Sequence, residues 1–94
     1  MTFEEAYLAV HKIMPSSYAV AAAEYEEAYV LQIAPIKLAG TAKAKRLMDS
    51  AVAVNKRTGA ISLWPPKNAR SGNKIRDIDP DPINGEWFAG ILVG

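Results

Sequence analysis

The stretch from residue 51 to residue 64 constrains the fold most strongly, because two alternating segments flank a polar loop that ends in glycine. This pattern predicts a β-hairpin. Gly59 follows Thr58 in the loop and supplies the positive φ that a type I turn followed by a bulge requires. Apolar side chains recur at every second position of each arm, so one face of the hairpin should be apolar. The motif predicts architecture and carries no chemistry.

The N-terminal segment predicts an amphipathic helix that lies on this sheet. Thr2 and Glu5 have the spacing of a capping box, in which each side chain binds the backbone N–H of the other residue. Pro15 should end the helix. Apolar side chains follow at helical spacing, at Phe3, Ala6, Tyr7, Val10, Ile13 and Met14.

Residues 18–35 admit two interpretations. The segment contains good helix formers and no glycine, which suits a second helix. However, Tyr29, Leu31 and Ile33 alternate with the residues between them, and residues 25–27 suit a polar turn between two strands. We favour the two strands.

The remaining segments differ sharply in composition. Residues 38–50 are a basic connection, and the prolines at 65 and 66 should stop the sheet, so residues 1–66 are expected to form the helix-plus-sheet unit. Residues 67–84 are rich in Pro, Gly, Asn, Arg and Asp and are expected to be an irregular surface linker. Residues 85–94 turn apolar again, which predicts either an added strand or a docking tail.

The expected fold class is therefore α+β, in one domain with a modest core. One N-terminal helix should pack on an antiparallel sheet of four or five strands, followed by an irregular segment that is first basic and then acidic. The chain has no cysteine, which gives no support to a secreted disulfide scaffold, so the cytoplasm is the expected location. No signal-peptide pattern or membrane-span pattern stands out, which predicts a soluble protein without a membrane partner.

The hairpin also carries a family resemblance, through Val54, Lys56, Arg57, Thr58, Gly59 and Ile61. With the helix and strands expected before it, residues 3–64 resemble the small α+β domains of PepSY type and of related bacterial immunity proteins. Small hairpin proteins of phages and prophages look similar. The resemblance implies binding and restraint of another protein, without catalysis. PepSY domains are typically exported, and the start of this chain departs from that pattern.

Charge is segregated along the chain, although the formal net charge is only +1. Residues 1–30 sum to −4, residues 31–76 to +9 and residues 77–94 to −4. The basic block contains a candidate surface for phosphate groups, formed by Lys43, Lys45, Arg46, Lys56 and Arg57. Nucleic acid is the less favoured partner, because no aromatic platform is interleaved with these residues and the acidic blocks would repel DNA.

We expect no catalytic, cofactor or metal site, and no enzyme activity. His11 is the sole histidine and has no cysteine to complete a metal-ligand set, so we interpret it as an ordinary helix-flank residue. The serines lie in no nucleophile-elbow context. The alternating carboxylates of residues 77–81 resemble the start of a calcium loop, but Pro82 and Phe88 stand where glycine and glutamate are needed.

The apolar tail carries the main functional expectation. Its candidate partner-binding residues are Trp87, Phe88, Ile91 and Leu92. Exposing them to water would cost about 25 cal/mol per Å² of apolar area, so their own sheet or a partner must cover them. The sequence predicts a non-catalytic protein-binding module, of phage-accessory or immunity type, whose partner is another protein or a copy of itself. The alternatives are a structural subunit of an assembly such as a virion, and a nucleic-acid-binding module that uses residues 37–76.

Overall fold

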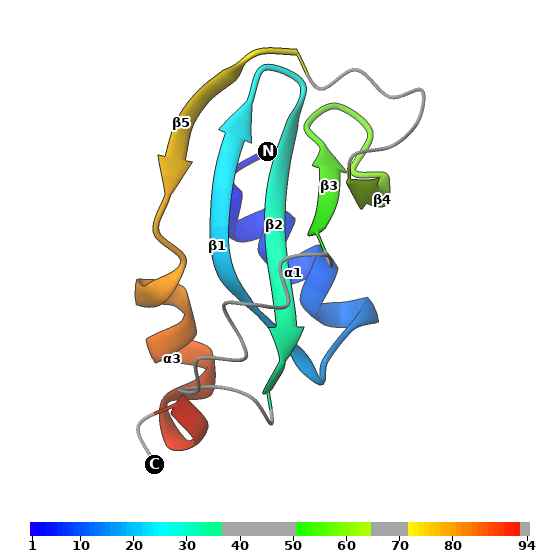
Figure 1. Cartoon of the computed structure of the whole chain (residues 1–94). Coiled ribbons are helices and arrows are strands. Elements are labelled where there is room, and N and C mark those ends of the chain that lie inside the picture. The colour runs from blue at the N-terminus through cyan, green and yellow to red at the C-terminus, as the bar shows by residue number, and fades with distance from the viewer. Residues whose placement is uncertain (37–50, 65–71, 93–94) are drawn as a thin grey trace.

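The structure is a computed structural model that describes residues 1–36, 51–64 and 72–92, without the side chains of Trp64 and residues 89–92. The expected α+β class is confirmed (Figure 1). The elements are α1 (Phe3–Ile13), β1 (Ser17–Tyr25), β2 (Ala28–Pro35), β3 (Ala51–Asn55), β4 (Ile61–Trp64), β5 (Lys74–Ile78) and α3 (Asp81–Leu92).

The five strands form one sheet in the order β4-β3-β2-β1-β5, and every neighbouring pair is antiparallel. Helix α1 lies across one face of the sheet, while α3 follows β5 beyond the end of that strand (Figure 1). Residues 18–35 are the two strands that we favoured, and the helical alternative is wrong. The hairpin of β3 and β4 is also confirmed, with Val54 opposite Ile61 and Val52 opposite Leu63.

Helix α1 begins at the expected capping box. The Thr2 N–H donates to Glu5 Oε1 at 2.9 Å, and the Glu5 N–H donates to Thr2 Oγ1 at 3.2 Å. Both bonds satisfy backbone donors that the first helical turn leaves free. The helix buries Ala6, Tyr7 and Val10 against the sheet, which is the face that the apolar spacing predicted.

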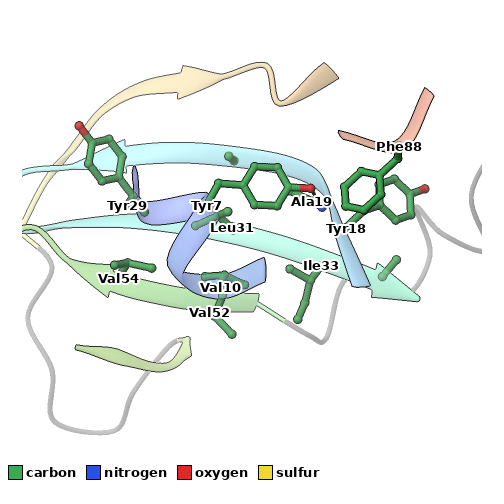
Figure 2. Packing of buried hydrophobic residues seen from close by; sticks show 13 residues of the cluster. Tyr7, Val10, Tyr18, Ala19, Tyr29, Leu31, Ile33, Val52, Val54 and Phe88 are labelled. Carbon is green, nitrogen blue, oxygen red and sulfur yellow. Dashed lines mark hydrogen bonds between the residues drawn. The ribbon is translucent and has the colours of Figure 1, made fainter. Parts of the chain in front are cut away.

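The core lies between α1 and one face of the sheet, and it extends to Phe88 of α3 (Figure 2). Its larger members are Tyr7, Val10, Tyr18, Tyr29, Leu31, Ile33, Val52, Val54 and Phe88. A smaller cluster on the other face of the sheet contains buried Ala28, Val30, Ala51 and Ala53. Large and small side chains alternate along β2 and β3, so the face toward α1 carries the larger side chains and the other face the smaller ones.

The turn between β3 and β4 has the glycine conformation that the sequence requires. Gly59 has φ +75°, in the left-handed region that other residues adopt at a cost. Asn55 supports the same turn, because its Oδ1 accepts from the N–H groups of Arg57 at 2.8 Å and Thr58 at 2.9 Å. Gly59 is confirmed as the structural turn residue.

Two expectations about the C-terminal third are wrong. The linker expected over residues 67–84 contains β5, which pairs with β1 through Ala22 opposite Ile78 and Glu24 opposite Arg76. The tail was expected over residues 85–94 as an added strand or a docking tail, and the strand is wrong, because residues 85–92 belong to α3, which starts at Asp81. Because β5 already occupies the free edge of β1, the tail finds no edge to pair with there. In the described residues no helix has the length and apolar character needed to cross a membrane.

Helix α3 is joined to the sheet by a closed set of buried hydrogen bonds. The Tyr7 hydroxyl donates to Asn84 Oδ1 at 2.6 Å and accepts from the Ala19 N–H at 2.6 Å. Asn84 Nδ2 donates to the Ala19 carbonyl at 2.7 Å, which closes the set. Burial raises the pKa of Tyr7 to about 12, so its hydroxyl keeps the proton that it donates. In Figure 2 the Tyr7 ring points from α1 toward Ala19.

Candidate protein-binding edge

The outer strand β5 is a charged edge. Lys74, Arg76 and Asp77 are exposed there, and Lys74 Nζ lies 2.6 Å from Asp77 Oδ1. The Asp77 carboxylate raises the pKa of Lys74. Charged side chains on an edge strand oppose pairing with another chain, because their desolvation is unfavourable. This edge of the sheet is therefore poorly suited to binding a further strand.

The opposite outer strand, β4, is uncharged. It reads Ile-Ser-Leu-Trp over residues 61–64. Leu63 is 78% exposed, although its neighbour across the hairpin, Val52, is buried in the core. Within residues 1–36, 51–64 and 72–92, no strand lies on the outer side of β4. Charged side chains are one device by which edge strands avoid pairing with another chain, and β4 carries none.

The hydrogen-bond pattern shows which backbone groups of β4 are available on that side. The Asn55 N–H donates to the Ala60 carbonyl at 2.9 Å. Bonding pairs alternate along an antiparallel ladder, so Ser62 directs its N–H and C=O toward β3. Ile61 and Leu63 direct theirs away from β3. We call the outward backbone groups of Ile61 and Leu63, together with the Leu63 side chain, the β4 edge.

An ionic cluster around Glu24 holds three parts of the sheet together. Glu24 Oε2 lies 2.6 Å from Lys56 Nζ, and Glu24 Oε1 lies 2.8 Å from Arg76 Nε. The hydrogen bonds from Lys56 and then Arg76 lower the pKa of Glu24. Lys56 Nζ also lies 5.1 Å from the centre of the Tyr29 ring. The cluster joins β1 to β5 and to the β3–β4 turn.

This cluster accounts for part of the candidate basic surface. The Lys56 ammonium forms an ion pair with Glu24, whereas the Arg57 side chain is exposed at the turn. Lys43, Lys45 and Arg46 lie outside the described residues. Of the five residues, the described part of the chain therefore contains Lys56 and Arg57, both in the β3–β4 turn.

A surface cavity of about 230 Å³ lies beside the same turns. It is lined by Glu26, Glu27, Asn55, Lys56 and Arg57. The lining mixes carboxylates with cations, and one of the cations is already paired with Glu24. Among the described residues no three potential metal ligands gather at one point. The cavity thus presents no convergent set of groups that would select one ligand.

The aromatic residues of the tail pack on their own chain. Phe88 is 4% exposed, with its ring centre 5.5 Å from that of His11 and 6.4 Å from that of Tyr18. The Trp87 ring lies 4.8 Å from Tyr7 and 5.4 Å from His11. The side chains of Ile91 and Leu92 lie outside the described part. Trp87 and Phe88 thus cover α1 and β1, and His11 is a packing residue on the flank of α1.

Leu63 is the candidate residue that sequence reasoning missed. Its alternation with Ile61 predicted a place on the apolar face, and it does lie on that face, but at an outer strand that α1 does not cover. The signal was the absence of charge from residues 61–64, compared with three charges in Lys74–Ile78. Identifying that signal required knowing which two strands form the edges.

No protein-family model, curated protein or solved structure matches the chain. The resemblance to PepSY-type and immunity-protein domains therefore stays a prediction, and the function is argued from geometry.

Proposed function

We propose that this chain is a non-catalytic protein-binding module, and that its binding surface is the β4 edge. The observation that carries the proposal is the 78% exposure of Leu63 on an uncharged edge strand, beside outward backbone groups of Ile61 and Leu63. The charged β5 edge is the contrast within the same sheet. The bound segment would be an extended, uncharged stretch of another protein that adds a strand beside β4.

Strand addition suits these groups for two reasons. Backbone hydrogen bonds to an added strand supply affinity, and alternating side chains supply selectivity. Leu63 lies on the α1 side of the sheet, where an apolar side chain of the partner would cover it. Burying a leucine fully is worth about 1.5–3 kcal/mol, so this one residue is a strong potential anchor.

The interface lies at the sheet edge in this proposal and not in the tail, because Phe88 is part of the core and the tilted Trp87 ring packs against Tyr7 of α1. An accessory role or an immunity-type role follows from the sequence resemblance and is proposed with it, in the cytoplasm that the absence of cysteine predicts. Both roles require binding to another protein, which the β4 edge would provide.

The test is affinity capture from the source cells with three matched baits. Leu63→Lys places a charge on the β4 edge, and Ile75→Lys places the same charge on the β5 edge, where Ile75 is 55% exposed. Both substitutions are at exposed positions, so circular dichroism should show the wild-type fold for each. We expect proteins that the wild type and Ile75→Lys retain and that Leu63→Lys loses at least tenfold.

Identical retention by all three baits would contradict the proposal. So would a large closed oligomer of the purified chain in light scattering, which favours the structural-subunit alternative. Retention of DNA or RNA that falls steeply with salt would favour the nucleic-acid alternative instead, because such binding depends on counterion release.

A further inference from the structure

We infer that the β4 edge also binds a second copy of this chain, with the two β4 strands antiparallel and related by a two-fold axis at Ser62. The inference rests on the proposed function in one respect, because it uses the same edge. It names a specific occupant, and the purified chain alone can test it.

The β4 strand of a second copy has the properties that a partner of the β4 edge needs. A strand added there must be uncharged, must have unpaired backbone groups on one side and must present an apolar side chain to Leu63. A second β4 has all three properties, because it carries no charge and has the same outward groups at Ile61 and Leu63. Such a contact is self-complementary, as a two-fold interface must be.

The geometry of an antiparallel pair selects the register. Residues directly opposite each other share a face, so the two-fold axis must pass midway between the two copies of one β4 residue. With the axis at Ser62, Ile61 lies opposite Leu63 of the second copy, and the outward groups of both residues form four hydrogen bonds between the chains. With the axis at Leu63, Ile61 would lie opposite residue 65, a proline that has no N–H to donate.

The same register places the side chains favourably. Leu63 meets Ile61 of the second copy on the α1 side of the sheet, next to Val52 and Val54 of the core. Ser62 meets Ser62 of the second copy on the other side. Ser62 is then the centre of a non-hydrogen-bonded pair, in which the Cα atoms approach to about 4.5 Å.

Charge favours the antiparallel arrangement. The β3–β4 turn with Lys56 and Arg57 precedes β4, so the two turns lie at opposite ends of an antiparallel pair. A parallel pair would place the two exposed Arg57 side chains next to each other. The contact involves three residues of each chain, which is small for a protein interface, so we expect a dimer in equilibrium with the monomer.

Cysteine cross-linking tests this register directly, because the chain has no cysteine of its own. Ser62→Cys places one thiol beside its symmetry mate, within the distance that a disulfide spans. Ile75→Cys is the matched control, with an exposed thiol on the charged β5 edge. Under mild oxidation at equal concentration, we expect at least ten times more disulfide-linked dimer from Ser62→Cys. Adding Leu63→Lys to that variant should reduce the yield at least tenfold.

Equal yields from the two cysteine variants would overturn the inference, as would a yield that Leu63→Lys leaves unchanged. The reduced variants should retain the wild-type circular dichroism spectrum, because both positions are exposed. The outcome is separable from the proposed function: Leu63-dependent capture of other proteins without cross-linking refutes the second copy only. Cross-linking without any Leu63-dependent capture refutes the binding of other proteins and keeps the second copy.

Discussion

At the scale of single residues, the side chains of Tyr7 and Asn84 make hydrogen bonds to the backbone of β1 that a neighbouring strand would otherwise make. The pairing of β5 with β1 covers Ala22 to Tyr25, and the backbone groups of Ala19 lie beyond its end. The Tyr7 hydroxyl and the Asn84 amide bind those groups in its place. Because both side chains are buried, each loses its partners without compensation from water when the other is removed.

Replacing Tyr7 with phenylalanine is therefore a sensitive test of this hydrogen-bond set. Tyr7→Phe keeps the ring but leaves the Ala19 N–H and Asn84 Oδ1 without the hydroxyl, so we expect a loss of about 1–3 kcal/mol in the free energy of unfolding, measured in urea. Tyr29→Phe is the control. Among the described residues the Tyr29 hydroxyl donates to the Met1 carbonyl, at 3.2 Å in a partly buried place, so its loss should be smaller. Equal losses would contradict the argument.

At the scale of elements, Glu24 connects strands that are distant in sequence. It lies on β1, and its two oxygens bind Lys56 at the β3–β4 turn and Arg76 on β5. A carboxylate with a lowered pKa stabilises the fold above its unfolded pKa. That contribution is lost as the pH falls through the folded value. The window lies below pH about 4.5, since the shift is downward from that value.

Substituting Glu24 with glutamine should remove this pH dependence. We expect Glu24→Gln to be less stable than the wild type at pH 7 and to converge with it as the pH falls below about 4.5, in urea unfolding followed by circular dichroism. Glu27→Gln removes a carboxylate from an exposed position of the neighbouring turn and should keep the wild-type curve. A constant difference between Glu24→Gln and the wild type at every pH would show that the ion pairs do not matter.

Elements that depend on local signals were predictable from the sequence. The capping box at Thr2 and Glu5 sets the start of α1, and the turn at Gly59 sets the register of β3 against β4. Each signal acts between residues at most a few positions apart. For the same reason the polar turn at Glu26 and Glu27 correctly separated β1 from β2.

Elements that depend on distant contacts were not predictable in this way. The strand β5 carries mostly exposed side chains, so its sequence shows no buried face, and pairing with β1 is what makes it a strand. Helix α3 contains Gly85 and Gly90, which weaken a helical pattern. A start signal was present, because Asp79 accepts from the Asp81 N–H and Pro82 occupies the first turn.

At the scale of the whole molecule, the two edges of the sheet differ in charge and in coverage. At one edge lie the charged strand β5 and helix α3, and Asn84 and Phe88 attach α3 to the core. At the other edge of the described sheet lies β4, with Leu63 exposed. The candidate edge thus escaped prediction for the same reason as β5, because only the strand order shows which segments lie outermost.

This asymmetry implies that self-pairing and binding of another protein exclude each other, because among the described strands β4 has a neighbour on one side, which leaves only its other side for binding. A disulfide-linked Ser62→Cys dimer should therefore lose at least tenfold in capture of the Leu63-dependent proteins, measured by quantitative mass spectrometry. Reduction of the same sample with dithiothreitol should restore capture, which makes the reduced sample its own control. Equal capture before and after reduction would place the binding of other proteins away from β4, since a closed pair of edges has no side left to offer.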